Sequence, residues 1–241
     1  MWKLFIYKTY IKHMEINKIY NIDCFDGFKL LDDNSVDHVF TSPPYNRKHR
    51  GTSKDQLNGS KSDKYKYSTD NIDDYFGFLC NVIDESLRVS KGFLFLNIMK
   101  NYYNKEDVFK LIGHYSDKIV DIHIHVKSNP LPASGKSVTN AFEFFIILGK
   151  GPLKSNTTYT KNVITTAVNS KMPKDHKAVM HQDVSDWFIE KFTKEGNLIL
   201  DPFMGYGTTA ITCIKKKRDF IGFELQKEYV ELSLERIKKE K

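Results

Sequence analysis

A short apolar strand that runs straight into a glycine-bearing turn constrains the fold of this 241-residue chain more than any other feature. Residues 198–201 read Leu-Ile-Leu-Asp, and residues 202–207 read Pro-Phe-Met-Gly-Tyr-Gly. Glycine has no Cβ and tolerates positive φ, so a Gly-x-Gly turn lets the backbone approach a ligand closely. In an open α/β sheet, ligands bind at the carboxyl ends of the strands, where the strand order reverses. The turn is therefore a candidate ligand site.

An acidic residue at the end of the next expected strand narrows the class of ligand. Glu224 follows Asp201 by 23 residues, a position from which a carboxylate binds the two hydroxyls of a ribose. A dinucleotide site would require a third glycine at position 210, which is Ala210. The pattern favours a nucleoside-containing cofactor, and a tight turn followed by a surface glutamate is the structural alternative.

Apolar strands alternate with helical patterns along the chain, which predicts a mostly parallel α/β sheet covered on both faces. We expect an arm over residues 1–15 and a single domain over residues 16–241, with Met14 as an alternative start. The expected strands are 18–23, 36–40, 92–98, 119–126, 142–148, 198–201 and 220–224. The expected helices are 25–31, 73–89, 105–115, 183–194, 208–217 and 226–239.

Two consecutive prolines follow the expected strand at 36–40. Residues 41–45 read Thr-Ser-Pro-Pro-Tyr, and we call them the proline motif. Proline fixes φ, restricts the preceding residue to extended backbone and donates no hydrogen bond, so the segment cannot continue as a central strand. It predicts a stiff rim that holds the Ser42 hydroxyl, backbone carbonyls and the Tyr45 ring at a strand end. These groups suit an amino group on a flat ring, and a simple turn that ends the strand is the alternative.

The formal net charge of +7 is concentrated in two segments. Residues 1–20 and 46–71 together account for all of it. A neutral body with a basic arm and a basic loop favours an extended polyanion as partner, although solubility alone also explains lysine-rich loops. No apolar run reaches the ~20 residues of a spanning helix, and the three cysteines are far apart without a CxxC pair. We therefore expect a cytoplasmic protein without a membrane span, a disulfide or structural zinc.

The two motifs, in this order, resemble those of the β-group of amino-methylating DNA methyltransferases from restriction–modification systems. In that family a catalytic (Asp/Asn/Ser)-Pro-Pro-(Tyr/Phe) motif precedes an Asp-Pro-Phe-x-Gly-x-Gly-Thr-Thr motif, and residues 42–45 and 201–209 match them. Residues 21–24 and 220–224 resemble weaker family motifs, so the resemblance covers residues 16–240. It implies a Rossmann-like S-adenosylmethionine-dependent methyltransferase fold, with a seven-stranded, mostly parallel and circularly permuted sheet.

The cofactor implied by this resemblance is S-adenosylmethionine. The glycine-bearing turn would line its methionine moiety, Glu224 would hold the ribose hydroxyls, and the segment after the first strand would border the adenine. The residues implied for cofactor binding are Asp23, Cys24, Asp201, Pro202, Phe203, Gly205, Gly207, Thr208 and Glu224.

The resemblance also assigns the chemistry to Ser42, Pro43, Pro44 and Tyr45. The Ser42 hydroxyl and the Pro43 carbonyl would accept hydrogen bonds from the amino group of a base flipped out of duplex DNA, while Tyr45 stacks on that base. These acceptors localise the nitrogen lone pair toward the methyl donor, so no covalent intermediate is needed. Serine in the first position resembles the cytosine-N4 enzymes, so we expect methylation of cytosine N4. Adenine N6 is the alternative, and a non-catalytic nucleic-acid-binding module is a more distant one.

Target recognition is expected between the two motifs, in residues 127–174. The basic loop 46–71 is expected to close over DNA. The side chains expected to contact DNA are Arg47, Lys48, Arg50 and Lys136.

The family resemblance also implies partners, and the spacing of the histidines bears on metal binding. Double-stranded DNA is the expected partner. The small recognition region leaves open either a short recognition site or a homodimer, and the family's origin adds a cognate restriction endonuclease. His176 and His181 have no third ligand at a suitable spacing, so no metal site is expected.

Overall fold

One eight-stranded sheet forms the centre of the protein, in the order β3-β10-β9-β4-β5-β7-β6-β8. The computed structural model describes residues 10–11, 14–47, 71–130, 132–133, 137–168 and 179–240. Neighbouring strands are parallel except for β7, which is antiparallel to both of its neighbours. The strands are β3 Lys18–Asn21, β4 His38–Thr41, β5 Leu94–Ile98, β6 Ile119–Lys127, β7 Phe142–Leu148, β8 Val163–Thr166, β9 Leu198–Asp201 and β10 Asp219–Glu224.

The α/β fold and the mostly parallel sheet are confirmed, but the sheet has one strand more than the expected seven. The additional strand, β8, lies at the edge of the sheet, pairs in parallel with β6 and falls inside the predicted recognition region. Its four residues read Val-Ile-Thr-Thr and only Thr166 is buried. The sequence therefore has neither the apolar run nor the alternating pattern that predicts a strand.

Two short strands precede β3. β1 Tyr10–Ile11 pairs antiparallel with β2 Met14–Glu15. Met14 is 1% exposed and belongs to the hydrophobic core. The domain therefore begins before residue 16, because Met14 packs in its core although it lies within the expected arm over residues 1–15.

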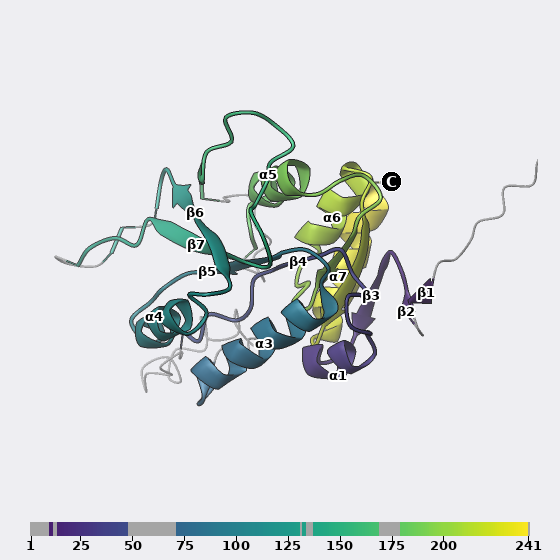
Figure 1. The fold of residues 1–241 in the computed structure, drawn as a ribbon, viewed down its shortest axis with the longest axis horizontal. Helices are drawn as coiled ribbons and strands as arrows, with labels where there is room; N and C mark the ends of the chain where they lie inside the picture. Colours follow the sequence, from purple (N-terminus) through teal and green to yellow (C-terminus); the bar gives the residue numbers. More distant parts are fainter. Residues whose placement is uncertain are drawn as a thin grey trace, which may run out of the picture.

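Helices cover both faces of the sheet and enclose two hydrophobic cores (Figure 1). Three of the described helices begin at a side chain that accepts a backbone N–H of the first turn; for example, Asp74 accepts a hydrogen bond from the Gly77 N–H. In the described parts of the chain, none of them is both long and apolar enough to cross a membrane. One face carries α1 Cys24–Lys29, α3 Tyr75–Val89 and α4 Lys105–His114, and the other carries α5 Gln182–Phe192, α6 Thr208–Lys215 and α7 Lys227–Glu240.

The strand order reverses between β4 and β9. From β9 the chain crosses through α6 to β10, and from β4 it crosses through α3 to β5 on the other side. Because β4 and β9 are adjacent and parallel, the proline motif and the glycine-bearing turn leave the same edge of the sheet side by side. We call this edge, where every strand of the sheet except β7 ends, the carboxyl edge.

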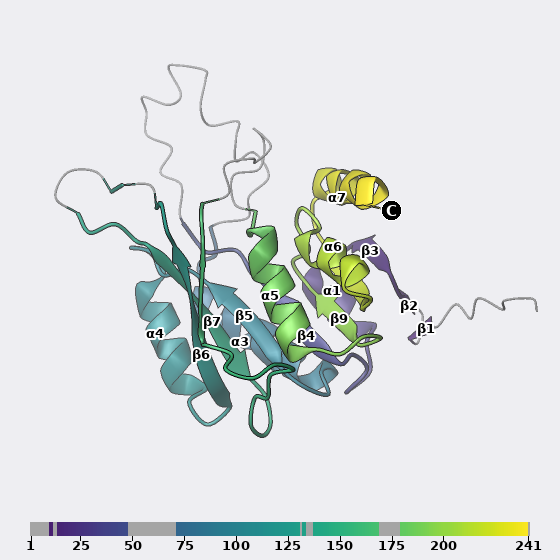
Figure 2. The same cartoon turned by 90° about the horizontal axis from the view of Figure 1, so that it is seen from above.

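The connections of the antiparallel part divide between the two edges (Figure 2). At the carboxyl edge lie residues 128–130, 132–133 and 137–141 of the β6–β7 connection and residues 167–168 after β8. The β7–β8 connection, residues 149–162, lies at the opposite edge. Only part of the predicted recognition region 127–174 therefore shares an edge with the proline motif.

Candidate functional site

The glycine-bearing turn is held in its conformation by α7. Gly205 has φ 53° and Gly207 has φ 78°, both in the left-handed region that favours glycine. A Cβ on Gly207 would also lie 2.8 Å from the Cβ of Ser233 in α7. Arg236 of α7 donates a hydrogen bond to the Tyr206 carbonyl, and its guanidinium lies 4.3 Å from the centre of the Tyr206 ring. The turn therefore needs glycine for its backbone angles and, at position 207, for the close approach of α7.

Asp201 joins the turn to the proline motif. Its Oδ1 accepts hydrogen bonds from the Thr41 hydroxyl (2.8 Å) and the Phe203 N–H (3.0 Å). Its Oδ2 accepts one from the Thr209 hydroxyl (2.6 Å). Burial raises the pKa of Asp201 to about 6 in spite of these three hydrogen bonds. The carboxylate therefore connects the ends of β4 and β9 with the start of α6.

Glu224 ends β10 next to this turn. Its Oε2 accepts the Gly205 N–H and its Oε1 accepts the Gln226 N–H, both at 2.8 Å. Burial raises the pKa of the Glu224 carboxyl. Since a carboxylate has about four acceptor positions, these backbone bonds leave acceptor capacity for hydroxyl donors. Glu224 is thus oriented by the backbone and still able to bind a pair of hydroxyls.

The remaining residues predicted for the cofactor surround the same strand ends. Asp23 follows β3, and its side chain caps α1 by accepting the Phe25 N–H at 2.9 Å. Cys24 is buried and burial raises the pKa of its thiol to about 12, which makes it a neutral packing group. Phe203 packs edge-on against Phe78 of α3, and Pro202 and Thr208 are buried at the two ends of the turn. The structure therefore brings the predicted residues together along β3, β10 and β9.

The proline motif holds two hydroxyls on one buried amide. Ser42 Oγ lies 3.1 Å and Tyr45 OH lies 2.6 Å from Asn97 Oδ1, and the two hydroxyls are 2.9 Å apart. Asn97, in β5, is 1% exposed and donates from Nδ2 to the Phe144 carbonyl at 3.3 Å, which orients its Oδ1 toward the hydroxyls. An amide oxygen only accepts hydrogen bonds. The hydroxyl protons therefore point toward Asn97, and Ser42 Oγ keeps its lone pairs for another donor.

Side chains from two neighbouring segments fix the backbone of the proline motif. The Tyr75 hydroxyl donates to the Pro44 carbonyl at 2.6 Å. The side-chain amides of Asn101 and Asn104 both donate to the Tyr45 carbonyl at 2.8 Å. Among the described residues, no donor reaches the Pro43 carbonyl. The motif is thus held by three side chains, and the Pro43 carbonyl next to Ser42 has no donor within the part of the chain that the structure describes.

A buried carboxylate affects the electrostatics of the motif. Burial raises the pKa of the Tyr45 hydroxyl well above its usual value, and the negative charge of Glu143 raises it further. Burial also opposes ionisation of Glu143 itself, but its interactions with His125 and Lys127 outweigh this effect and lower its pKa to about 2. Tyr45 is therefore a neutral hydrogen-bond donor at every physiological pH.

Few of the predicted DNA contacts fall on the described residues. The Arg47 guanidinium lies 5.9 Å from the centre of the Tyr45 ring, so this cation is at the proline motif. Residues 48–70 of the expected closing loop 46–71 lie outside the described residues, and so do the other three predicted contacts, Lys48, Arg50 and Lys136.

Of the two histidines considered as metal ligands, the structure describes only one. His176 lies outside the described residues, and His181 is the N-cap of α5, where its side chain accepts the Asp183 N–H. Within the described residues, no three His, Cys, Asp or Glu side chains converge as metal ligands.

Three residues of the site were missed by sequence reasoning. Thr41 and Thr209 bind the Asp201 carboxylate, and Asn97 binds both hydroxyls of the proline motif. Asn97 did carry a signal, because it is the one polar residue in the apolar run Leu94–Ile98. A lone amide near the carboxyl end of a buried strand needs hydrogen-bond partners, and the ligand edge is where they lie.

A known protein family matches the part of the chain that contains both motifs of the site. The family described as DNA methylase, with N6 and N4 members, matches residues 36–235. The chain belongs to this N6/N4 DNA methylase family. The match includes both the proline motif and the glycine-bearing turn of this DNA methylase.

Curated relatives of this DNA methylase are Type II methyltransferases. M.MwoI of Methanothermobacter wolfeii is 32% identical over 211 residues, which cover 81% of this chain and 30% of that protein. M2.MboI of Moraxella bovis is 26% identical over 247 residues, covering 95% of this chain and 90% of that protein. The chain thus spans less than a third of M.MwoI but nearly the whole length of M2.MboI.

Solved structures share the fold. The cytosine-N4-specific PvuII DNA methyltransferase has a TM-score of 0.70 at 17% identity, covering 92% of this DNA methylase and 90% of that chain. M1.HpyAVI, solved as a complex with SAM, has a TM-score of 0.65 at 21% identity, covering 91% and 98% of the two chains.

Proposed function

We propose that the chain is an S-adenosylmethionine-dependent DNA methyltransferase that methylates the exocyclic N4 amino group of a cytosine flipped out of duplex DNA. The observation that carries this proposal is the hydrogen bond between Thr41 and Asp201. It joins a set of hydrogen-bond acceptors for an amino group to a turn suited to a nucleoside cofactor, at the ends of two adjacent strands.

The residues present fit S-adenosylmethionine. Glu224 has acceptor positions left for the two ribose hydroxyls, and it is oriented by the Gly205 N–H. The turn has no Cβ at Gly205, where a Cβ would meet nothing closer than the Phe203 carbonyl oxygen at 3.8 Å, so its backbone can lie against the methionine moiety there, and Asp23 with Cys24 would border the adenine. When bound, this cofactor supplies an electrophilic methyl group.

The polarity of the proline motif suits an amino nucleophile. The nitrogen lone pair of cytosine N4 is delocalised into the ring, which makes the group a poor nucleophile. Ser42 Oγ and the Pro43 carbonyl accept its two hydrogens and so localise the lone pair. Asn97 is an amide and takes no proton, so the site orients the neutral amino group by hydrogen bonds, and the surplus proton of the methylated nitrogen leaves to solvent after the methyl group has been transferred.

Base flipping is required because the amino group is stacked and paired within the duplex, and it costs a few kcal/mol. Tyr45 would stack on the flipped base, with Arg47 beside it. The choice of cytosine N4 rests on serine at the first position of the motif, and the cytosine-N4 specificity of the structurally similar PvuII enzyme is in line with it. Adenine N6 is the alternative target, since the family contains both kinds.

The test is nucleoside mass spectrometry of plasmid DNA from a methylation-deficient host that expresses the chain. We expect N4-methylcytosine, and N6-methyladenine would overturn the assignment of the base while keeping the reaction. Ser42→Ala should remove methylation without changing S-adenosylmethionine affinity. Ser155→Ala, in the connection at the opposite edge, is the matched control and should change neither. The proposal would be refuted if neither methylated base is detected and the folded protein does not bind S-adenosylmethionine.

A further inference from the structure

The segment between β5 and α4 is both basic and aromatic, with the sequence Lys-Asn-Tyr-Tyr-Asn-Lys over residues 100–105. We call it the tyrosine rim. Its two asparagines face inward and tie the turn together, since the Asn101 N–H donates to Asn104 Oδ1 at 2.6 Å and the Tyr103 N–H donates to Asn101 Oδ1 at 2.8 Å. Both asparagine amides also donate to the Tyr45 carbonyl. The tyrosine rim is therefore fixed directly against the proline motif.

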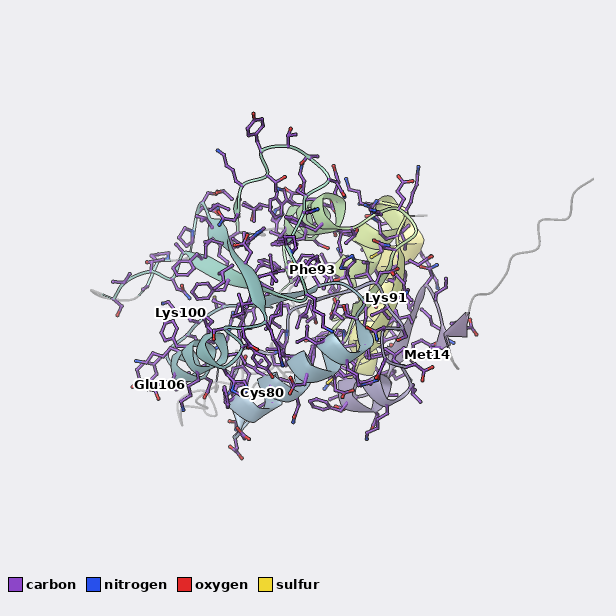
Figure 3. All side chains as sticks on the ribbon, viewed as in Figure 1. Met14, Cys80, Lys91, Phe93, Lys100 and Glu106 are labelled. Carbon is purple, nitrogen blue, oxygen red and sulfur yellow. The ribbon has the colours of Figure 1, made fainter. Side chains whose placement is uncertain are left out.

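The two tyrosines of the rim face outward. Tyr102 is 80% exposed and Tyr103 is 38% exposed, with their rings 5.3 Å apart and nearly perpendicular. The Lys105 ammonium lies 5.8 Å from the Tyr102 ring centre, and the Lys100 ammonium lies 5.7 Å from that of Phe142. Figure 3 shows Lys100 at the end of the molecule that carries α4. The rim thus presents aromatic surface and two cations to the solvent on a rigid support.

We infer that the tyrosine rim is a DNA-contacting element, in which Tyr102 stacks on a base or sugar next to the flipped nucleotide and the two lysines contact phosphates. This inference rests on the proposed function. Flipping a base out of the duplex exposes the faces of its neighbours, and stacking on an aromatic side chain covers such a face whatever the base. The cations of Lys100 and Lys105 complement the phosphate backbone on either side of the ring.

The charges around the rim also give the direction of approach. Glu106 and Asp107 lie in the first turn of α4, where negative charge favours the helix N-terminus. These carboxylates repel phosphates from the part of α4 that follows Lys105. DNA therefore approaches over Lys100 and the proline motif, the side on which Arg47 also lies.

The experiment compares Tyr102→Ala and Tyr102→Phe with a matched control, Tyr159→Ala. Tyr159 is 99% exposed but lies in the β7–β8 connection at the opposite edge. Binding of a fluorescently labelled duplex of mixed sequence is measured by anisotropy, and methylation of unmethylated plasmid DNA is measured in parallel. We expect Tyr102→Ala to weaken DNA binding about 5- to 150-fold, with Tyr102→Phe and Tyr159→Ala within about twofold of wild type. S-adenosylmethionine affinity should be the same in all four proteins, which shows that they are folded.

The lysines are tested by the salt dependence of DNA binding. Lys100→Ala and Lys105→Ala should each reduce the slope of log K against log salt concentration by about 0.9, the value for one phosphate contact. The inference is overturned if wild type binds and methylates DNA and Tyr102→Ala does so equally well. It is also overturned if Tyr102→Ala abolishes self-association in sedimentation while DNA binding stays intact, since the rim is then a protein interface. A wild-type protein that binds S-adenosylmethionine but neither binds nor methylates DNA would refute the proposed function itself.

Discussion

Replacing Asn97 by leucine tests whether the buried amide sets the polarity of the Ser42 hydroxyl. Leucine has a similar volume but neither accepts nor donates. Without Asn97 Oδ1, the hydroxyls of Ser42 and Tyr45, 2.9 Å apart, can satisfy only one of their two protons between them. If Tyr45 donates to Ser42, the Ser42 proton turns toward the base. Ser42 Oγ then presents a donor to the amino group of the base, which needs an acceptor at this position.

The magnitude follows from counting the groups that lose a partner. One hydroxyl proton is left unpaired in a buried site, and the Phe144 carbonyl, which lies within the paired strand β7, loses one donor. At about 1 to 3 kcal/mol for the unsatisfied hydroxyl, the free energy of unfolding should fall by about 1 to 3 kcal/mol. If the misoriented Ser42 hydroxyl costs the transition state about 1.4 to 3 kcal/mol of stabilisation, kcat falls by about 10- to 100-fold.

The assay is methylation of plasmid DNA with radiolabelled cofactor, alongside urea unfolding and calorimetric binding of S-adenosylmethionine. Asn97→Asp keeps an accepting oxygen and should recover most of the rate. Asn156→Ala removes a side chain that donates to the Glu190 and Thr193 carbonyls at the opposite edge, so it should lower stability without lowering kcat. A wild-type kcat in folded Asn97→Leu would refute the reasoning, as would a kcat loss in Asn156→Ala of the same size.

Three further predictions concern stability and its dependence on pH. Gly207→Ala should destabilise the protein more than Gly151→Ala, because both glycines have φ 78° but only the Cβ at 207 meets a neighbour, Ser233, at 2.8 Å; equal losses in urea unfolding would contradict this. The pKa of Asp201 rises from 3.8 in the unfolded chain to about 6, so the unfolded state releases its proton first as pH rises. Relative to Asp201→Asn, wild type should therefore lose up to about 3 kcal/mol of stability between pH 3.8 and 6, and parallel urea midpoints over that range would show the reasoning to be wrong. Burial lowers the pKa of His38 from 6.5 to about 4, so here the unfolded state takes up a proton first as pH falls. Relative to His38→Gln, wild type should lose up to about 3 kcal/mol between pH 6.5 and 4, and a pH-independent difference would count against a buried neutral histidine.

The elements that the sequence predicted are those whose pattern is local. Strands such as β5 and β9 are continuous apolar runs because both of their faces are covered, and the turn after β9 follows from its glycines. β8 was missed because an edge strand with one buried residue needs no such run. Asn97 was missed for a different reason: its role depends on β5 lying beside β4, an alignment that only the folded sheet creates.

The hydrogen bond between Thr41 and Asp201 shows that the site depends on which strands are adjacent in the sheet and not on how close the two motifs are in the sequence. The residues are 160 positions apart, but they end parallel neighbours in the sheet. What the chemistry requires is that an acceptor-rich rim and a glycine-bearing turn leave adjacent strands on the same edge, and either strand could come first in the sequence. Since Asp201 also accepts from Phe203 and Thr209, a shift of the turn is transmitted to the residue that precedes Ser42. Thr41→Val should therefore lower the rate of methylation more than it lowers S-adenosylmethionine affinity, because it removes the connection and leaves both motifs in place.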